Sequence, residues 1–438
     1  MTANNCWRTA PADALNGEIT VPGDKSISHR AIMLGALAEG VSEVSGFLEG
    51  EDCLATMHAF QAMGVPIHHH GEGKVTIEGQ GLQGLEAPDQ ALDVGNSGTS
   101  MRLMAGVLAG QAFDSVLVGD HSLMRRPMAR VTEPLNKMGA RIHTSETGTA
   151  PIAIQAAQLR GIDYALPVAS AQLKSCLLFA GLYAQGRTML HDCGVSRDHS
   201  ERMLQGFGVD LIIDGTTIGI EGGQRLRGRE VVVPGDVSSA AFFIVAALIA
   251  PQADVLIHNV GMNPTRAAVI DILQAMGGDI TILNARESGG EPVADLRVKS
   301  SQLRGITIDP RLVPIAIDEF PVIFVAAACA QGVTRATDLA ELRVKESDRL
   351  AVMAAGLQAC GVRCDEGESS LTIEGGGLLG GATIDSDGDH RIAMSFAVAG
   401  VVAREPITIN NCATVASSFP NFRELAVSLG MHIEVNDA

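Results

Sequence analysis

One short apolar sequence pattern occurs six times, and this repeat limits the possible folds more than any other feature of the chain. QAMGVPI, NKMGARI, QGFGVDL, QAMGGDI, QACGVRC and SLGMHI each join the end of an amphipathic helix to a glycine and a short strand. The glycines are Gly64, Gly139, Gly208, Gly277, Gly361 and Gly430, spaced 69 to 84 residues apart. Glycine suits the left-handed position just past a helix end. The repeat therefore predicts six similar units.

A polar turn followed by an apolar helix precedes each of these phrases. The turns are GDKSIS, GNSGTS, ASAQLK, GDVSSA, IDEFPV and GDHRIA. Each unit then reads as strand, polar turn, helix, short strand, loop, helix, glycine and strands. Units of this length are too large for a solenoid, and each can form a small sheet with two helices. With three units per domain, we predict an α/β (α+β) protein of two similar domains.

The sequence VPGD occurs twice, ending at Asp24 and at Asp236. Proline and glycine suit a bend where the chain passes from one domain to the other. We therefore predict a discontinuous domain of residues 1–22 and 236–438, and a second domain of residues 23–235. A double passage of this kind is a natural hinge, so we expect the active site in the cleft between the domains.

Charge and composition exclude several classes of protein. The net charge of −18 argues against a nucleic-acid partner. The apolar run AAFFIVAALIA is about half of the roughly 20 residues that a membrane helix needs, and the N-terminus lacks a signal pattern. The eight cysteines show no metal-ligand spacing, which favours buried reduced thiols in a cytoplasmic protein. His68–His70 are interpreted as an exposed loop, with metal binding as the alternative.

The polar turns carry cations at predicted helix N-termini, which favour anions. GDKSISHR places Lys25, Ser26 and Arg30 together, a combination typical of phosphate or carboxylate recognition. A capped surface helix with solvated basic residues explains this turn equally well. The other turns offer Asn96, Gly98, Thr99, Arg102, Arg125, Arg126, Arg130, Ser170, Gln172, Lys174, Arg197, Asp198 and His199.

The C-terminal half adds acids to these cations. Asp318 and Glu319 directly precede an apolar helix, where acids either favour the helix start or act as a general base. In RVKESDR, Lys345 and Arg349 are four residues apart, and like charges at that helical spacing repel unless an anion lies between them. A salt-bridged surface helix is the alternative. The implied substrates carry several negative charges.

The motifs VPGDKSISHR, GNSGTSMR, RRPM, SAQLKS, SRDH, RVKESDR and GDHRIAM, in this order, resemble those of 5-enolpyruvylshikimate-3-phosphate synthases along essentially the whole chain. The resemblance implies two domains, each of three βαβαββ units in a pseudo-threefold arrangement. It implies transfer of the enolpyruvyl group of phosphoenolpyruvate to the 5-hydroxyl of shikimate 3-phosphate, with release of phosphate, in chorismate synthesis. It also implies no metal or organic cofactor, and a monomer.

The resemblance also implies the role of each matched residue. Lys25, Asp318 and Glu346 are the implied catalytic residues, with Asp318 taking the hydroxyl proton and Glu346 delivering one to the methylene carbon. The implied shikimate 3-phosphate site comprises Lys25, Ser26, Arg30, Ser170, Ala171, Gln172, Arg197, Asp318 and Lys345. The implied phosphoenolpyruvate site comprises Lys25, Asn96, Gly98, Arg126, Gln172, Arg349 and Arg391.

Two departures from the best-known pattern of the family point to its more divergent second class. Ala171 stands where many members have serine, and Ser417 stands where many have a lysine before the terminal (S/T)FP, which is Ser418-Phe419-Pro420 here. The motifs VKESDR and SRDH point to the same class. Gly98 occupies the position where alanine in some members blocks glyphosate, so we expect glyphosate binding. The alternatives are a UDP-N-acetylglucosamine enolpyruvyl transferase, whose loop cysteine is missing after Gly110, and an inactive binding protein on the same fold.

Overall fold

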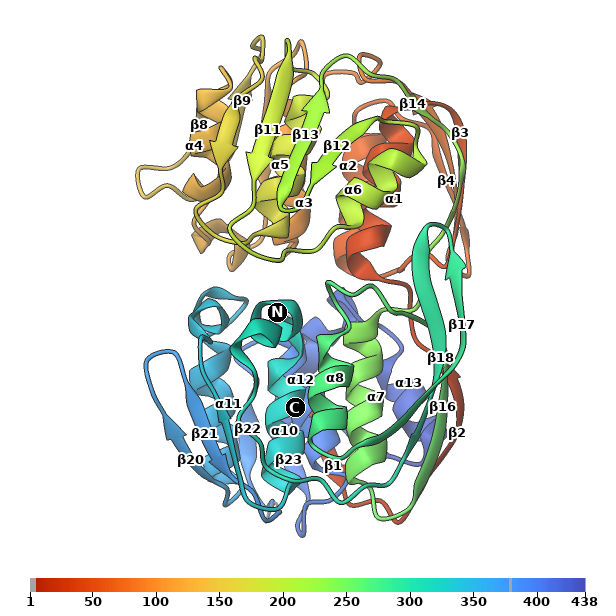
Figure 1. Ribbon diagram of the computed structural model, residues 1–438, viewed down its shortest axis with the longest axis vertical. Coiled ribbons are helices and arrows are strands. Elements are labelled where there is room, and N and C mark those ends of the chain that lie inside the picture. The colour runs from red at the N-terminus through yellow and green to blue at the C-terminus, as the bar shows by residue number, and fades with distance from the viewer. Residues whose placement is uncertain (1–4, 378–379, 438) are drawn as a thin grey trace. The chain divides into compact units, whose positions relative to one another are not determined.

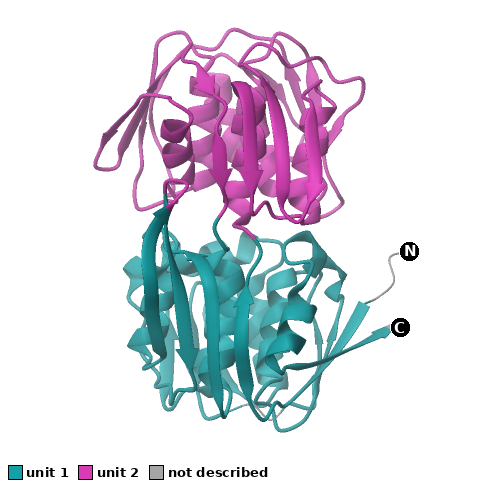
Figure 2. Cartoon of the chain, turned by 90° about the vertical axis from the view of Figure 1, so that its right-hand side faces the viewer, with its two compact units in different colours: residues 1–22, 234–287, 291–438 teal, residues 23–233, 288–290 magenta. Residues whose placement is uncertain are grey.

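The computed structural model describes residues 5–377 and 380–437, which form two compact units (Figures 1 and 2). Unit 1 comprises residues 1–22, 234–287 and 291–438, as far as they are described, and unit 2 comprises residues 23–233 and 288–290. The chain thus passes from unit 1 to unit 2 after Pro22 and returns after Val233, within the two VPGD sequences. The turn of residues 288–290 is grouped with unit 2, although residues 279–287 and 291–299 on either side of it belong to unit 1.

Each unit alternates helices that follow polar turns with helices that end at the repeated glycines. The helices of unit 2 are α1 (Lys25–Leu37), α2 (Glu51–Gln61), α3 (Gly98–Leu108), α4 (Ala129–Lys137), α5 (Ala171–Gly181) and α6 (His199–Gly206), with the 3-10 helix η1 (Leu123–Arg125). Those of unit 1 are α7 (Val237–Ile249), α8 (Ala268–Ala275), α9 (Val313–Ala316), α10 (Phe320–Cys329), α11 (Arg349–Ala359), α12 (His390–Ala399) and α13 (Phe422–Leu429), with η2 (Pro310–Leu312), η3 (Ile317–Glu319), η4 (Ala340–Val344) and η5 (Cys412–Ser417).

The strands of unit 2 form three mixed sheets in the described chain. Their orders are β14-β3-β5-β4 with β15 also on β3, β6-β7-β9-β8, and β10-β11-β13-β12. The strands are β3 (Ala38–Ser45), β4 (Ile67–Gly71), β5 (Lys74–Gln80), β6 (Leu92–Asp93), β7 (Ser115–Val118), β8 (Arg141–His143), β9 (Ile152–Gln155), β10 (Asp163–Ala165), β11 (Arg187–His191), β12 (Leu211–Asp214), β13 (Thr217–Glu221), β14 (Leu226–Arg227) and β15 (Glu230–Val232).

Unit 1 likewise has three sheets among its described residues. Their orders are β22-β23-β1-β24, β17-β18-β16-β2 and β19-β21-β20. The strands are β1 (Asn5–Ala10), β2 (Leu15–Thr20), β16 (Ala253–Gly261), β17 (Asp279–Ser288), β18 (Glu291–Lys299), β19 (Val333–Ala336), β20 (Arg363–Glu366), β21 (Leu371–Glu374), β22 (Thr383–Asp385), β23 (Ile407–Asn410) and β24 (His432–Asp437). Six small sheets agree with the six predicted units.

The repeated glycines have the predicted conformation. The backbone φ angle is positive at all six of them, from 82° at Gly64 to 107° at Gly430. A residue with a Cβ atom is strained there, so glycine lets each second helix stop and the chain turn into the next strand. This prediction from the sequence is confirmed.

The two VPGD sequences connect strands and helices in a reciprocal pattern. Strand β2 precedes the first VPGD and pairs in parallel with β16, which follows α7. Strand β15 precedes the second VPGD and pairs in parallel with β3, which follows α1. Each strand therefore completes a sheet of the unit that the chain is about to leave.

The apolar helices after the polar turns form the cores. In unit 1, α7, α10 and α12 pack against one another, and nearly all their residues are buried (Figure 1). The stretch Pro310–Cys329 is long and apolar enough to span a membrane by length and composition alone, but 72% of its most apolar window is buried inside the protein. This stretch is therefore part of the core of unit 1.

Two expectations about surface residues were wrong. His68–His70 form part of the exposed strand β4 instead of a loop, and they contact Glu78, Glu49 and Thr76, respectively. Because each imidazole ring contacts a different side chain, the three rings do not converge on one metal site. The cysteines are free thiols as expected, but Cys193 is exposed and not buried.

Candidate active site

The predicted polar turns are helix N-termini. In unit 2, the side chains of Asp24, Ser97 and Ser170 cap α1, α3 and α5 by accepting a hydrogen bond from a backbone N–H of the first turn. In unit 1, Asp236 and Asp389 cap α7 and α12 in the same way. Such helix ends combine free N–H donors with partial positive charge, so they favour anionic ligands.

Lys25 is the first residue of α1, and its ammonium group pairs with the carboxylate of Asp52 in α2. The side chains are 23% and 8% exposed, respectively, so this ion pair is largely shielded from water. A shielded pair with close contact holds a long lysine side chain in one position. Asp52 therefore orients Lys25, and its only signal in the sequence is an acid in the first turn of the next helix.

Two arginines meet at the N-terminus of α3. Arg126 donates a hydrogen bond from Nη2 to Asn96 Oδ1 at 2.7 Å, and Arg102 donates from Nη1 to Gln172 Oε1 at 2.7 Å. A Cβ atom on Gly98 would lie 3.1 Å from Nη1 of Arg126 and 3.2 Å from Nη1 of Arg102. Glycine thus lets both guanidinium groups approach the first turn of α3.

The other predicted residues of unit 2 differ in accessibility. Arg30 is 3% exposed, and its three guanidinium nitrogens donate to Ser200 Oγ, the carbonyl of Ser26 and Ser175 Oγ at 2.7 to 2.8 Å. Ser26 and Ala171 are half-buried at the starts of α1 and α5, and Arg197 is half-buried in the loop before α6. We call the ten predicted residues of this unit the unit 2 set: Lys25, Ser26, Arg30, Asn96, Gly98, Arg126, Ser170, Ala171, Gln172 and Arg197.

In unit 1, Arg349 is the centre of a buried ionic network. It is 1% exposed, and its Nε donates to Asp389 Oδ2 at 2.7 Å. Its Nη2 donates to Glu346 Oε2 at 2.5 Å, and its Nη1 lies 3.3 Å from Asp318 Oδ1. Burial alone would lower the pKa of Arg349, but these carboxylates, that of Asp389 foremost, raise it. The guanidinium therefore keeps its charge inside the protein.

Asp389 fixes this network and was not predicted as a site residue. It is fully buried, accepts from Ser347 Oγ at 3.1 Å, and caps α12 by accepting from the backbone N–H of Arg391 at 2.9 Å. Burial alone would raise the pKa of Asp389, but the guanidinium of Arg349 holds it below its ordinary value. Its sequence signal was only that of a helix cap.

Lys345 lies near Arg349, but not for the reason that the sequence suggested. Helix α11 begins at Arg349, and Lys345 lies in the bend that precedes this helix. Lys345 and Arg349 therefore do not share a helical face. An anion does lie between them, because Asp318 Oδ1 is 3.2 Å from Lys345 Nζ and 3.3 Å from Arg349 Nη1. The predicted helical geometry was wrong, whereas the predicted anion between the cations is a carboxylate of the protein.

Arg391 lies in the first turn of α12, and its side chain reaches back to η3. Its Nη1 donates to the carbonyl of Asp318 at 2.9 Å and lies 3.6 Å from Glu319 Oε1. Its side chain is 15% exposed. We call Asp318, Lys345, Glu346, Arg349 and Arg391 the unit 1 set, which the structure brings together around η3 and the starts of α11 and α12.

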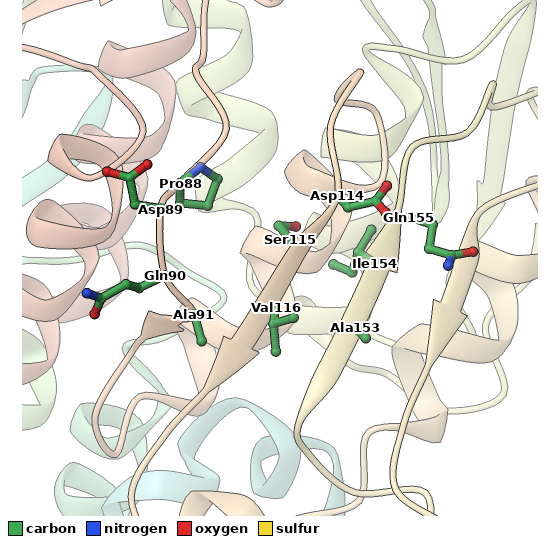
Figure 3. A pocket seen from close by; sticks show the side chains of 10 residues that line it. All are labelled: Pro88, Asp89, Gln90, Ala91, Asp114, Ser115, Val116, Ala153, Ile154 and Gln155. Carbon is green, nitrogen blue, oxygen red and sulfur yellow. The ribbon is translucent and has the colours of Figure 1, made fainter.

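One cavity shares no lining residue with either set. It has a volume of about 310 Å³, and residues of β7, β9 and the segment before β6 line it (Figure 3). The lining residues are Pro88, Asp89, Gln90, Ala91, Asp114, Ser115, Val116, Ala153, Ile154 and Gln155. This cavity has no cationic side chain, so it does not suit a multiply anionic substrate.

Both sets combine helix N-termini with arginine and lysine side chains, the arrangement that recognises phosphate and carboxylate groups. The unit 1 set adds two carboxylates, Asp318 and Glu346, which can move protons. The fold and these residues define an α/β enzyme that acts on small, multiply anionic substrates.

Comparison with known proteins identifies the family. The family model for EPSP synthase (3-phosphoshikimate 1-carboxyvinyltransferase) matches residues 9–425. The chain is 59% identical over 431 residues to the 3-phosphoshikimate 1-carboxyvinyltransferase of Methylococcus capsulatus, covering 98% of each chain. It is 55% identical over 425 residues to that of Legionella pneumophila, covering 97% of this chain and 98% of the relative.

A solved structure of EPSP synthase from Acinetobacter baumannii superposes with a TM-score of 0.90 at 52% identity, covering 99% of this chain and 100% of that one. The chain belongs to the EPSP synthase family. It is an enzyme, a 3-phosphoshikimate 1-carboxyvinyltransferase of the shikimate pathway.

Proposed function

We propose that the unit 1 and unit 2 sets together bind phosphoenolpyruvate and shikimate 3-phosphate, the substrates that the family implies. In this proposal, shikimate 3-phosphate contacts Lys25, Ser26, Arg30, Ser170, Ala171, Gln172, Arg197, Asp318 and Lys345. Phosphoenolpyruvate contacts Lys25, Asn96, Gly98, Arg126, Gln172, Arg349 and Arg391. The resemblance of motifs supports each assignment, and the clustering of cations at helix starts agrees with it.

The observation that carries the proposed mechanism is the position of Asp318. Its carboxylate lies 3.2 Å from Lys345 Nζ and 3.3 Å from Arg349 Nη1. Anionic groups of the substrates would compete for the same cations, which releases the carboxylate toward the 5-hydroxyl. That hydroxyl is a poor nucleophile until a base accepts its proton, so we assign the base to Asp318.

Glu346 supplies the second proton transfer in this mechanism. Its carboxylate accepts a hydrogen bond from Arg349 Nη2 at 2.5 Å, which places an acid–base group beside a proposed phosphoenolpyruvate ligand. In this mechanism Glu346 takes up a proton from solvent before the reaction and then donates it. Protonation of the methylene carbon makes the adjacent carbon electrophilic, and the 5-oxygen then forms a bond to it. The tetrahedral intermediate then loses phosphate, which takes up the proton held by Asp318, and it returns one methyl proton to Glu346, which restores the enol double bond. Lys25 stabilises the charge that develops during both steps.

We further propose that the chain belongs to the divergent second class and acts as a monomer in the cytoplasm. Ala171 and Ser417 support the class assignment, because they depart from the best-known pattern of the family. We also propose that glyphosate binds beside Gly98, where no Cβ atom crowds Arg102 and Arg126. An inhibition constant that stays the same in Gly98→Ala would contradict glyphosate binding at this position.

Release of phosphate from phosphoenolpyruvate by the purified protein tests the acceptor. We expect release with shikimate 3-phosphate and none with UDP-N-acetylglucosamine. Release with the nucleotide sugar alone would support enolpyruvyl transfer but contradict shikimate 3-phosphate as the acceptor. Folded protein that releases phosphate with neither acceptor would support an inactive binding protein on this fold.

The proton-transfer roles are tested by Asp318→Ala and Glu346→Ala. Both variants should bind shikimate 3-phosphate, measured by calorimetry, yet lose at least about 100-fold in kcat, the usual contribution of a general acid or base. Asp309→Ala is the control, because its exposed ion pair with Arg311 lies outside both sets. Near-normal turnover in either variant removes that residue from the proposed mechanism.

A further inference from the structure

Unit 1 contains a second cluster of buried polar and charged residues, Asp236, Ser238, Arg266 and Glu319, which contacts the unit 1 set at Arg391. Arg266 donates from Nη2 to Ser238 Oγ at 2.7 Å and to Asp236 Oδ1 at 3.2 Å. Ser238 Oγ in turn donates a short hydrogen bond to Glu319 Oε1. These four residues are at most 7% exposed, and they come from the helix cap of α7, α7 itself, the segment before α8, and η3. Nothing in the proposed mechanism uses them.

Glu319 connects this buried cluster to the proposed phosphoenolpyruvate site. It directly follows Asp318, its side chain is fully buried, and its Oε1 lies 3.6 Å from Arg391 Nη1 and 3.8 Å from Arg266 Nη2. The same Nη1 of Arg391 donates to the carbonyl of Asp318 at 2.9 Å. The guanidinium of Arg391 is thus held against η3 by one backbone carbonyl and one buried carboxylate.

Burial of the Glu319 carboxylate lowers the free energy of unfolding unless its charge is compensated. An ionised carboxylate that leaves water costs several kcal/mol unless cations and donors compensate it. Its Oε1 has a hydroxyl donor and two guanidinium groups around it, whereas its Oε2 has no hydrogen-bond partner among the described residues. An apolar side chain would fill this core position at less cost, so stability alone gives a poor account of the acid.

We propose that Glu319 is a positioning residue for phosphoenolpyruvate binding, which sets the orientation of Arg391 and is itself held by Ser238 and Arg266. This inference rests on the proposed role of Arg391 as a ligand of phosphoenolpyruvate. It also gives the second VPGD sequence a function, because Asp236 both caps α7 and holds Arg266.

The test is the steady-state kinetics of Glu319→Gln, which keeps the shape of the side chain and removes its charge. We expect the KM for phosphoenolpyruvate to rise about 10-fold, while the KM for shikimate 3-phosphate changes less than 2-fold. Displacement of a guanidinium by a fraction of an ångström is enough for an effect of this size. An unchanged or lower KM for phosphoenolpyruvate would overturn the proposal, because it would show that the carboxylate only repels the substrate or only supports the fold.

Asp295→Asn is the matched control. Asp295 is 8% exposed in the same unit and accepts from the backbone N–H of Asn259 and from Asn284, outside both sets. Loss of stability alone should therefore appear in this variant without a change in KM. If Glu319→Gln does not fold, Ser238→Ala replaces it, since it removes the hydroxyl donor and leaves every charge in place. We expect a KM increase of about 3-fold there, and an unchanged KM would overturn the proposal.

A double-mutant cycle separates this inference from the proposed function. If Arg391→Lys leaves the KM for phosphoenolpyruvate unchanged, the assignment of Arg391 fails. If Arg391→Lys raises this KM while Glu319→Gln does not, only the positioning role of Glu319 fails. If both hold, the effect of Glu319→Gln should shrink at least 3-fold in the Arg391→Lys background, because the carboxylate acts through the guanidinium. Additive effects would contradict the proposed coupling.

Discussion

Replacement of Gly98 by alanine separates ligand recognition from stability at the start of α3. The new Cβ atom would lie 3.1 Å from Arg126 Nη1 and 3.2 Å from Arg102 Nη1, so each guanidinium must move by a few tenths of an ångström. Both groups are flexible side-chain ends, and the backbone at Gly98 is helical rather than left-handed. The fold therefore accepts the change, and the strain appears in the position of the two cations.

The magnitude follows from this displacement. A misplacement of about 1 Å at a reacting or binding group costs on the order of 100-fold, so a few tenths of an ångström corresponds to roughly 3- to 10-fold. We expect the KM for phosphoenolpyruvate to rise by this factor, with kcat nearly unchanged. The free energy of unfolding should stay the same or increase by up to about 1 kcal/mol, because alanine favours a helix more than glycine does.

Initial rates of phosphate release over a range of phosphoenolpyruvate concentrations, at saturating shikimate 3-phosphate, measure the expected effect. Gly194→Ala is the control, because a Cβ atom there meets only the Cβ of Ala169 at an ordinary 3.4 Å. An unchanged KM in Gly98→Ala would refute the reasoning, since the two cations would then tolerate the added methyl group without loss of binding. A large loss of stability would refute the structural part of the argument instead.

Three further outcomes are expected. Burial, together with nearby cations, holds the pKa of His29 well below 6.5. Only the unfolded chain then binds this proton, so the free energy of unfolding should fall by about 1 kcal/mol as the pH falls from 6.5 to 5.5. Urea unfolding should show a smaller pH dependence in His29→Gln. Asp389→Ala should destabilise the protein by roughly 3–5 kcal/mol in denaturant unfolding, because it removes the main buried partner of Arg349. The half-exposed Asp309→Ala, which removes only the cap of η2 and a pair with Arg311, should cost no more than about 1 kcal/mol. Cys193 should react first with a thiol reagent, because it alone is exposed, and Cys193→Ser should abolish the fast phase.

Two predictions that depend on neighbouring residues in the sequence are confirmed. The glycine after each second helix has the expected left-handed backbone, and the polar turns cap helices as expected at Asp24, Ser97, Ser170 and Asp389. A helix cap needs one side chain and an N–H group within the next turn, so a few adjacent residues contain all the information. The family motifs, read in order, led to the same family that the comparisons show.

Predictions that depend on distant segments were incomplete or wrong. Lys345 was expected to share a helical face with Arg349, but α11 begins only at Arg349, and the carboxylate of Asp318 brings the two cations together instead. Asp52 gave no sign that it would pair with Lys25. In each case the partner of a charge comes from another helix or turn, and local periodicity contains no information about it.

The sequence by itself determined the repeat, the glycine that ends each second helix, and the supply of cations and acids at the polar turns, because capping and backbone preference act over a few residues. Only the tertiary structure decided how the charges are paired. Arg349 and Asp389 are 40 residues apart, yet they form the buried pair at the centre of the unit 1 set. Burial strengthens such a pair and makes a lone charge costly, so packing of distant segments selects the partners.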